Sequence, residues 1–382
     1  MNKQKLNIFV DAHGFDQEFQ GSRSFIQEIY TLLAHKNDIQ LYLGAYDTKN
    51  LAAHFSAQSG IQYIQYRSRS SIFRLLFNIP SIIRKYGIDY AHFQYMAPLF
   101  KNCRHIITTH DVLFMQSKKD FSFGYRTIRK LLCKRAAKKA DLLTTVSAFS
   151  KASIAKYFGI NPSKINIIGN GVHPRYFEQF DKGSETAIIK ARFGFDKFIL
   201  YVSRIEPRKN HSLLLNIYLE LELYRQGYNL VLLGHQSIGV PEFDKLLAEL
   251  PDAIRNMIFM SSTIKEKELL SFYRAATVFV YPSRAEGFGI PPLEAAATRS
   301  LVLCSNKTAM DQYHFFGVDH VDPEDKELFK SRLSAILHDT PDTGSLDRIS
   351  QKIKQDYCWQ QQADKLYTLI MDHHNSITDQ PK

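Results

Sequence analysis

Several features that mark other protein classes are scarce in this chain of 382 residues. No apolar run reaches the roughly 18 residues of a membrane-spanning helix, so we expect no transmembrane segment. The opening, MNKQKLNIFV, has too short an apolar run for a signal peptide, which predicts a cytosolic protein. Cys103, Cys133, Cys304 and Cys358 lie far apart without paired metal-ligand spacing. They are therefore predicted to be buried free thiols rather than disulfides or zinc ligands.

Common cofactor and metal motifs are also missing. No strand-like run is followed by G-x-G-x-x-G with an acidic residue about 20 positions further on, which disfavours a NAD-dependent oxidoreductase. The chain has no Walker-type phosphate loop. No further His and Asp residues stand at the spacing that a metal-dependent phosphohydrolase needs around the pair His110 and Asp111. We therefore predict neither a cofactor nor a bound metal.

Acidic residues are fewer than basic ones, and the resulting net charge of +11 calls for an anionic partner. Arg67–Lys85 carries five basic and no acidic residues among apolar ones, and Lys118–Lys139 carries nine basic residues against one acidic. Such basic amphipathic segments suit a membrane surface, and solvated helix faces are the alternative interpretation. Composition alone leaves nucleic acid, a membrane and a phosphorylated small molecule open.

Short β-rich runs alternate with longer helical patterns along the chain, which is typical of parallel sheets covered by helices. The candidate strands lie at residues 6–13, 39–46, 61–66, 90–96, 104–111, 142–147, 165–172, 198–205, 229–235, 257–263, 277–283 and 301–306. A polar, weakly periodic linker at residues 174–185 separates two halves, and residues 345–373 have a helical pattern. We predict Rossmann-like, doubly wound domains at residues 1–178 and 179–355, and a returning helix at 356–382. Such domains bind ligands at the carboxyl ends of their strands.

The string YPSRAEGFGIPPLEAAA, residues 281–297, joins a β-rich run, a glycine-containing turn and the start of a helix. Pro291 and Pro292 suit a first helical turn, because their missing N–H groups would have no partner there. The N-terminus of a helix favours a phosphate group. Glu286 and Glu294 are placed to accept hydrogen bonds from the hydroxyls of one ligand, and solvated surface carboxylates are the alternative.

The stretch EGFGIPPLEAAA, with its E-x7-E spacing, resembles the donor motif of glycosyltransferase family four, a group of retaining enzymes that use nucleotide sugars. The resemblance implies a GT-B fold, in which two Rossmann-like domains face each other across a cleft and the C-terminal helix returns to the N-terminal domain. It implies that Glu286 contacts the transferred sugar and Glu294 the ribose. It also implies that the backbone of Gly287, Phe288 and Gly289 approaches the sugar and the diphosphate.

The sequence departs from the family's pattern directly after this motif. The family usually has a glycine soon after the alanines of the helix, whereas this chain has Thr298, Arg299 and Ser300. We therefore expect an altered turn. Residues 307–317 also lack the family's common Pro-Glu pair, and Asp311 is the candidate to serve in its place.

A second motif, VSRIEPRKN at residues 202–210, follows the first candidate strand of the C-terminal half. Arg204 and Lys209 stand where a strand end would meet a ligand. Two cations there would stabilise a leaving diphosphate, which removes the need for a metal. A charged loop without function is the alternative by position, but the family has an arginine and a lysine at these two points, contacting the diphosphate.

The N-terminal half contributes two further candidates. His110 ends a candidate strand and matches a family histidine near the transferred sugar, although an isolated His-Asp pair is more often structural. Gly21, in the string FQGSRS at residues 19–24, stands at the expected glycine loop that approaches the donor phosphate. An ordinary helix start is the alternative for Gly21.

Together these features predict a retaining, metal-independent hexosyltransferase. His110 and Glu286 would position the sugar, Arg204 and Lys209 would stabilise the leaving group, and by family analogy no protein nucleophile is assigned. A mannose-type donor on GDP is preferred over a UDP-sugar, and the acceptor would be a glycan or lipid-linked glycan in bacterial surface polysaccharide assembly. We expect a cytoplasmic enzyme with a peripheral contact to the plasma membrane through the two basic segments, and no nucleic acid. The alternatives are a GT-B epimerase, a phosphorylase, or a non-enzymatic membrane-binding or nucleic-acid-binding protein.

Overall fold

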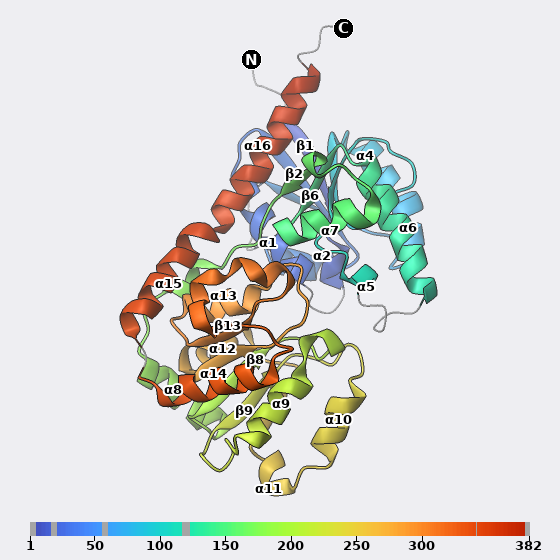
Figure 1. The fold of residues 1–382 in the computed structure, drawn as a ribbon. Helices are drawn as coiled ribbons and strands as arrows, with labels where there is room; N and C mark the ends of the chain where they lie inside the picture. The colour runs from blue at the N-terminus through green and yellow to red at the C-terminus, as the bar shows by residue number, and fades with distance from the viewer. Residues whose placement is uncertain (1–4, 17–20, 56–59, 117–122, 341, 379–382) are drawn as a thin grey trace. The chain divides into compact units, whose positions relative to one another are not determined.

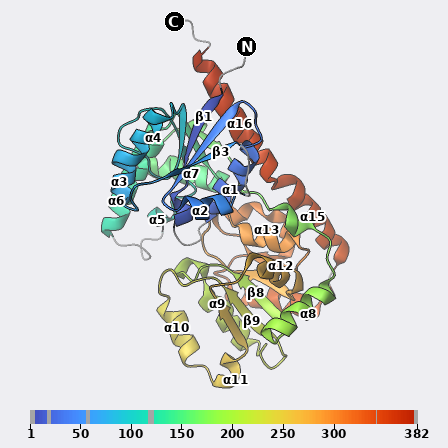
Figure 2. The same cartoon turned by 180° about the vertical axis from the view of Figure 1, so that it is seen from behind.

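The computed structural model describes residues 5–16, 21–55, 60–116, 123–340 and 342–378. The chain divides into two units, one made of Met1–Asn170 with Trp359–Lys382 and the other of Gly171–Cys358. Each unit is a parallel β-sheet with helices packed on it (Figures 1 and 2). Every candidate strand run contains a strand, so the predicted doubly wound class is confirmed. The short strand β13 (His320–Val321) was not predicted.

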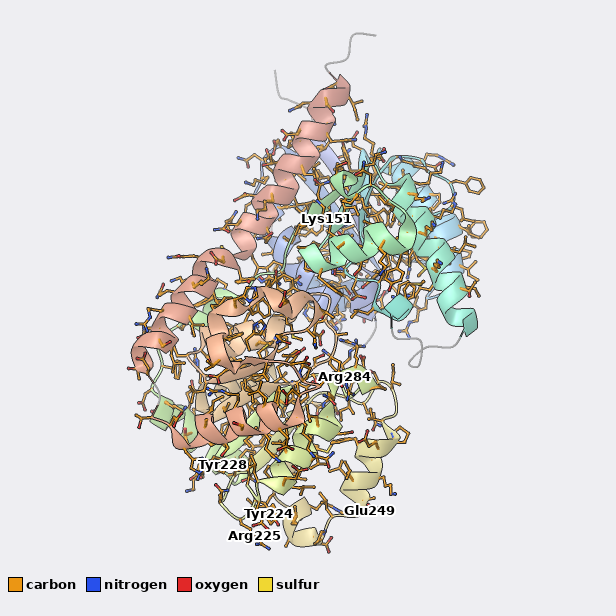
Figure 3. All side chains as sticks on the ribbon, viewed as in Figure 1. Lys151, Tyr224, Arg225, Tyr228, Glu249 and Arg284 are labelled. Carbon is orange, nitrogen blue, oxygen red and sulfur yellow. The ribbon has the colours of Figure 1, made fainter. Side chains whose placement is uncertain are left out.

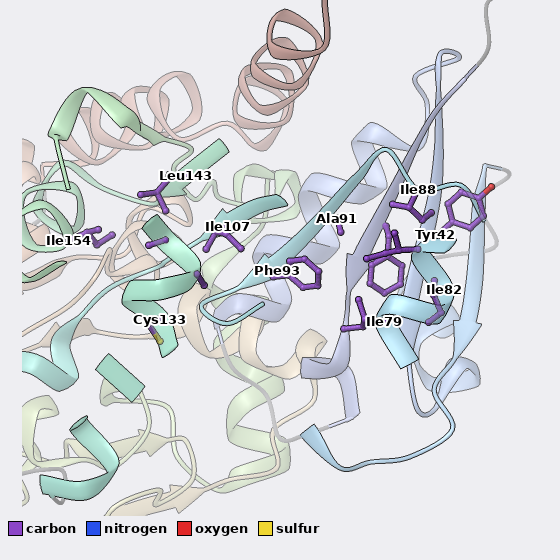
Figure 4. Close-up of a cluster of buried hydrophobic side chains, with 14 of the residues drawn as sticks. Tyr42, Ile79, Ile82, Ile88, Ala91, Phe93, Ile107, Cys133, Leu143 and Ile154 are labelled. Carbon is purple, nitrogen blue, oxygen red and sulfur yellow. The ribbon is translucent and has the colours of Figure 1, made fainter. Parts of the chain in front are cut away.

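The N-terminal unit is built on a seven-stranded sheet in the order β3-β2-β1-β4-β5-β6-β7. Its strands are β1 (Leu6–Asp11), β2 (Ile39–Ala45), β3 (Ile61–Gln65), β4 (Tyr90–Gln94), β5 (Arg104–Thr108), β6 (Leu142–Thr145) and β7 (Ile165–Ile167). Its helices are η1 (His13–Asp16), α1 (Gly21–Leu33), α2 (Thr48–Ala53), α3 (Ser71–Phe73), η2 (Arg74–Asn78), α4 (Ile79–Lys85), α5 (Leu113–Gln116), α6 (Phe123–Lys139), α7 (Ala148–Phe158), η3 (Pro162–Lys164) and α16 (Trp359–Thr378). Figure 4 shows part of the apolar core between the sheet and these helices, including Ile79, Phe93 and Cys133.

The second unit has a six-stranded sheet in the order β10-β9-β8-β11-β12-β13. The other strands are β8 (Phe198–Val202), β9 (Asn229–Leu233), β10 (Ile258–Ser261), β11 (Val278–Tyr281) and β12 (Val302–Ser305). Its helices are η4 (Pro174–Phe177), α8 (Lys182–Phe193), η5 (Pro207–Lys209), α9 (His211–Glu220), α10 (Pro241–Ala248), α11 (Asp252–Arg255), α12 (Glu266–Ala275), α13 (Ile290–Ala297), η6 (Thr308–Gln312), η7 (His314–Asp319), α14 (Lys326–His338) and α15 (Thr343–Asp356). Among the described residues, no helix is both long and apolar enough to cross a membrane.

The helical pattern near the C-terminus belongs to two helices rather than one. It breaks at Tyr357 and Cys358, so that α15 belongs to the second unit and α16 to the first. Helix α16 packs on α1, with the ring of Trp359 6.4 Å from that of Phe25. The Tyr367 hydroxyl also donates to Asp38 at 2.6 Å. These contacts confirm the expected return of the C-terminal helix to the N-terminal domain.

The turn after α13 shows how the chain replaces the family's glycine. Arg299 has a φ of 60°, in the left-handed region that favours glycine. The N–H groups of Arg299 and Ser300 donate to the carbonyls of Ala296 and Ala295 at 3.0 and 3.1 Å, which is the pattern of a Schellman helix end. The turn is therefore the one that a glycine would make, with an arginine in its place. The Arg299 side chain pairs with Asp347 at 2.5 Å.

We predict that Arg299→Gly is at least as stable as the wild type and about 1 kcal/mol more stable than Arg299→Ala. Both variants lose the exposed ion pair with Asp347, which contributes about 0 to 1 kcal/mol. Only Arg299→Ala keeps a Cβ in the left-handed conformation. Urea unfolding would measure the difference, and an alanine variant as stable as the glycine variant would contradict the assignment.

Candidate functional site

In the second unit, the loops after β8 and β11 meet, because these parallel strands are neighbours and end at the same edge of the sheet. The first loop carries residues 203–210 and the second residues 282–289. The backbone N–H of Arg284, labelled in Figure 3, donates to the carbonyl of Arg208 at 2.8 Å. The Oγ atom of Ser283 lies 3.3 Å from the same carbonyl. Two motifs that are far apart in sequence therefore form one polar cluster.

Glu286 is the centre of this cluster. Its Oε1 accepts hydrogen bonds from Lys209 at 2.5 Å, the Ser283 hydroxyl at 2.6 Å and the Tyr281 hydroxyl at 3.2 Å. Its Oε2 accepts one from Arg208 at 3.0 Å. Oε1 is therefore saturated by protein donors, whereas Oε2 has capacity for another hydrogen bond.

Burial and mutual attraction set the pKa values of Glu286 and Lys209. Burial alone would raise the pKa of Glu286, but Arg208 and Lys209 outweigh it and lower the pKa to about 2. Burial also lowers the pKa of Lys209 to about 8, even though Glu286 favours its charged form. Glu286 is thus ionised at neutral pH, with Lys209 as its counter-ion.

Arg208 and Glu206 are members of this cluster that the sequence analysis did not single out. Glu206 forms ion pairs with Arg204 at 3.0 Å and with Arg208 at 2.9 Å. It also accepts a hydrogen bond from the Ser237 hydroxyl at 2.8 Å. The alternating basic and acidic residues in RIEPRK, residues 204–209, were the sequence signal that could have identified Glu206 and Arg208. Of the predicted cations, Lys209 has only 8% of its side chain exposed, whereas Arg204 has 38% exposed. Arg204 is therefore the cation that solvent, and hence a ligand, reaches.

The glycine-containing turn leads into α13 as predicted from the sequence. Gly289 precedes the helix with a φ of 93°, and an added Cβ would lie 2.9 Å from the Met310 side chain. The Tyr313 hydroxyl holds the turn by donating to the carbonyls of Phe288 and Gly289 at 2.8 and 3.1 Å. Phe288 is buried beside Tyr357, and Gly287 is also buried. The backbone at the start of α13 is thus held in one conformation.

Glu294 lies in a different environment from Glu286. Its Oε2 accepts a hydrogen bond from the Tyr273 hydroxyl at 2.9 Å, and burial raises its pKa. Among the described residues its hydrogen-bond partners are Tyr273 and Tyr176, and not the cations of the Glu286 cluster. That Glu286 and Glu294 share one ligand stays a prediction.

Gly234, at the end of β9, is a further residue that the sequence analysis missed. It has a φ of 147°, and a Cβ there would lie 2.0 Å from the backbone oxygen of Ser203 and 3.2 Å from the nitrogen of Arg204. No side chain fits at that distance. The absence of a side chain therefore lets the β9 loop pass directly beside the loop that carries Arg204.

In the N-terminal unit, His110 follows β5 and is buried. Its Nε2 pairs with Oε1 of Gln94 at 2.5 Å, and the ring of Phe25 packs edge-on at 5.3 Å. Burial lowers the pKa of His110 to about 4, so the ring is neutral at physiological pH. Because Oε1 of Gln94 can only accept, Nε2 carries the proton and Nδ1 has a lone pair available.

Gly21 is the first residue of α1, and a Cβ built there meets no atom of the described residues within 4 Å. The described part of the chain therefore does not require glycine at this position. Residues 19 and 20 of the predicted glycine loop lie outside the described part of the chain.

We predict that Glu286→Gln lowers the free energy of unfolding by about 3 kcal/mol at pH 7, because it leaves Lys209 buried without a counter-charge. Since the pKa of Glu286 is lowered from 4.5 to about 2 in the folded protein, its stabilisation is present above pH 4.5 and is lost as the pH falls toward 2. The difference between wild type and variant should shrink over that range in urea unfolding. Glu324→Gln, which breaks only the half-exposed pair with Arg284, is the control and should cost less than about 1 kcal/mol. Equal effects of the two substitutions would contradict the role of Glu286.

Comparison with known proteins shows which family the chain resembles. Residues 21–176 match the family model described as Glycosyltransferase Family 4, and residues 185–356 match Glycosyl transferases group 1. The chain is 27% identical over 240 residues to the O-antigen chain mannosyltransferase RfbU of Salmonella typhimurium, covering 63% of this chain and 62% of that protein. It is 28% identical over 259 residues to the O-antigen chain mannosyltransferase B of Escherichia coli, covering 66% and 67%.

Solved structures share the fold at lower identity. Sucrose-phosphate synthase from Thermosynechococcus elongatus superposes with a TM-score of 0.76 at 16% identity, over 98% of this chain and 100% of that one. WaaG, a glycosyltransferase involved in lipopolysaccharide biosynthesis, superposes with a TM-score of 0.71 at 18% identity, over 94% and 99%. Matched family models over most of the sequence, and the same two-sheet architecture, show that the chain is a glycosyltransferase of family 4 with the GT-B fold.

Proposed function

We propose that this protein is a retaining, metal-independent hexosyltransferase that moves a mannose-type sugar from a nucleotide diphosphate donor to a glycan or lipid-linked acceptor. The observation that carries the proposal is the cluster of Arg204, Glu206, Arg208, Lys209 and Glu286 at the carboxyl ends of β8 and β11. It holds three cations at the strand edge where doubly wound domains bind their ligands.

On the donor side, Arg204 is the group that meets the diphosphate. Its guanidinium is partly exposed and held by Glu206, so it is oriented before a ligand arrives. As the glycosidic bond to the donor breaks, negative charge grows on the leaving phosphate, and Arg204 with Lys209 stabilises it. The start of α13 after Gly289 adds a positive dipole end, although Pro291 and Pro292 contribute no N–H group there.

Glu286 has two tasks in this proposal. Its Oε1 holds Lys209 in the charged form, and its Oε2, which has spare capacity, accepts a hydrogen bond from a hydroxyl of the transferred sugar. Glu294 takes the ribose, and the backbone of Gly287 and Phe288 approaches the sugar. These roles follow the family pattern position by position.

His110 acts as a neutral hydrogen-bonding group. A ring with a pKa near 4 is not a cation at physiological pH, so His110 orients the sugar through the lone pair of Nδ1. By family analogy the leaving phosphate takes the proton of the acceptor hydroxyl, and no protein nucleophile is assigned. Gly21 is proposed to leave room for the donor phosphate, since no atom of the described residues fills the space beside it.

The relatives support the choice of sugar. Two of them are named as O-antigen chain mannosyltransferases and another as a serotype-specific mannosyltransferase, which favours a GDP-mannose-type donor over a UDP-sugar and bacterial surface polysaccharide as the product. The cytoplasmic face of the plasma membrane is the proposed place of the reaction.

Thermal-shift measurements with GDP, UDP and ADP test the donor. We expect GDP to raise the melting temperature most, and Arg204→Gln to weaken GDP binding by about 10- to 100-fold, the loss of one charge-assisted hydrogen bond. Arg225→Gln is the matched control, because Arg225 is an exposed arginine of the same unit that pairs with Glu222. Nuclear magnetic resonance of the product should show the donor's anomeric configuration. An inverted product, or no shift with any nucleotide, would rule the proposal out.

We further propose that the N-terminal unit contacts an anionic membrane through a face formed by α3, η2 and α6. The apolar side chains exposed on this docking face are Ile72, Phe73, Leu76, Phe77, Ile128, Leu131 and Leu132. Figures 1 and 2 both place α6 beside the α3 to α4 segment. Arg67, Arg84 and Lys85 are exposed on the same segment, which supplies the positive charge.

The structure corrects the prediction for one residue of the basic segment Arg67–Lys85. Arg74 is 5% exposed and faces the interior, because it pairs with the buried Asp11, so it does not contribute to a charged surface. Residues 118–122 of the second basic segment lie outside the described part of the chain.

Co-sedimentation with vesicles of anionic phospholipid tests the membrane contact. Replacing Ile72 and Phe77, 70% and 59% exposed, by serine should weaken vesicle binding at least about tenfold, since each buried apolar side chain contributes roughly 1.5 to 3 kcal/mol. Serine at Ile188 and Leu328, exposed on the second unit, is the matched control and should leave binding unchanged. Equal binding of both double variants would argue against the docking face.

A further inference from the structure

The N-terminal unit contains a pocket that none of the roles above uses. It has a volume of about 170 Å³ and lies at the carboxyl ends of β1, β2 and β3. His13 and Asp16 follow β1, Tyr46 follows β2, and Arg69 follows β3. At about 30 Å³ for one water, the volume suits a phosphoryl group or one sugar ring, and not a longer chain.

The floor of the pocket is a buried ion pair. Asp11 is 1% exposed, and its carboxylate lies 3.4 Å from Nε of Arg74 and 3.1 Å from Nδ1 of His13. The Tyr66 hydroxyl donates to Asp11 at 2.8 Å. Although burial opposes the charged form, His13 and Arg74 hold the pKa of Asp11 below its ordinary value. Asp11 therefore fixes Arg74 in place as a cation.

The backbone is shaped around this arrangement. A Cβ on Gly44 of β2 would lie 2.5 Å from the Tyr66 hydroxyl, so only glycine lets Tyr66 reach across β2 to Asp11. The floor therefore depends on a residue from each of the three strand ends and is a built feature rather than a gap between loops.

Arg74 is buried, and its Nε is a buried donor without a hydrogen-bond partner among the described residues. Its contact with Asp11 is an ion pair only, and the side chain lines the pocket. A buried donor without a hydrogen-bond partner costs free energy, because it has left water without a replacement. A ligand oxygen in the pocket would be a partner for the guanidinium that lines it.

Arg69 adds a second guanidinium to the same space. It stacks on the ring of Tyr46 at 4.7 Å, and no carboxylate in the described part of the chain pairs with it. The carboxylate of Asp16 is turned to the backbone instead, where it accepts the N–H groups of Tyr46 and Asp47 at 2.8 Å each. Arg69 and Arg74 are the two arginines that line the pocket, and their planar guanidinium groups match the oxygens of a phosphoryl or carboxylate group.

We propose that this pocket is an acceptor subsite that binds an oxyanion, a phosphoryl or carboxylate group, through Arg69 and Arg74. The inference rests on the proposed glycosyltransferase function, and it specifies an acidic acceptor. Arg74 lies on the inner side of the short helical segment whose outer side carries Ile72 and Phe77 of the docking face. An oxyanion held here is thus beside the proposed membrane surface, where the phosphoryl group of a lipid-linked acceptor would lie.

The test is calorimetric titration of the full chain with inorganic phosphate at constant ionic strength, with and without saturating GDP. Wild type should bind phosphate in both cases, and Arg69→Gln should weaken binding at least about tenfold, the loss of one charge-assisted hydrogen bond. Arg67→Gln, an exposed arginine two positions away that does not line the pocket, is the matched control and should change binding less than about twofold. Arg74→Lys keeps the charge beside Asp11 but loses the planar fork, and it should also weaken binding.

Glucuronate and glucose replace phosphate in two further titrations, so that a carboxylate, a phosphoryl group and a neutral sugar are compared. Glucose binding as tight as that of phosphate would overturn the proposal, and so would equal losses in Arg67→Gln and Arg69→Gln. Intact GDP binding without any phosphate site would remove this inference and leave the proposed function standing. If phosphate binding depends on Arg69 but the protein binds no nucleotide, the oxyanion pocket is supported and the proposed glycosyltransferase function is contradicted.

Discussion

The buried carboxylate of Glu286 is the interaction on which the second unit's site depends. It lies among Lys209, Arg208, Ser283 and Tyr281, and these groups come from the end of β11 and from the loops that follow β8 and β11. Removing a charge from water is expensive, and only this set of close partners keeps Glu286 ionised at neutral pH. The same contacts also hold two segments in place, the loop that presents Arg204 and the turn that starts α13.

The N-terminal unit handles its buried polar groups differently. Around β4 and β5 it uses neutral groups: His92 accepts or donates hydrogen bonds with Tyr30 at 2.5 Å and with Thr108 at 2.6 Å, and burial keeps its pKa low. His110 belongs to the same region and is neutral for the same reason. Around β1 and β3, in contrast, the unit pairs a charged Asp11 with Arg74. Two polar environments, one neutral and one ionic, therefore lie on a single sheet.

Backbone conformation matters at a few positions, and in opposite ways. Gly234 has no side chain because the neighbouring loop occupies the space, so the constraint is steric. Arg299 keeps a side chain in a left-handed conformation, and Asp347 pairs with that side chain. A family glycine can be replaced at the second kind of position at a modest conformational cost, and at the first kind not at all.

The sequence by itself determined the elements and named several residues of the candidate site. Alternating β-rich and helical patterns predicted the two doubly wound sheets, and the strings EGFGIPPLE and VSRIEPRKN predicted Glu286, Arg204 and Lys209, because periodicity and motifs are local properties of the chain. Only the tertiary structure decided which groups meet. Lys209 and Glu286 are 77 positions apart, and Arg74 turned inward, away from its basic neighbours, because Asp11 lies beneath it. Pairings of this kind depend on which strands are neighbours in the sheet, and a linear pattern of charges does not contain that information.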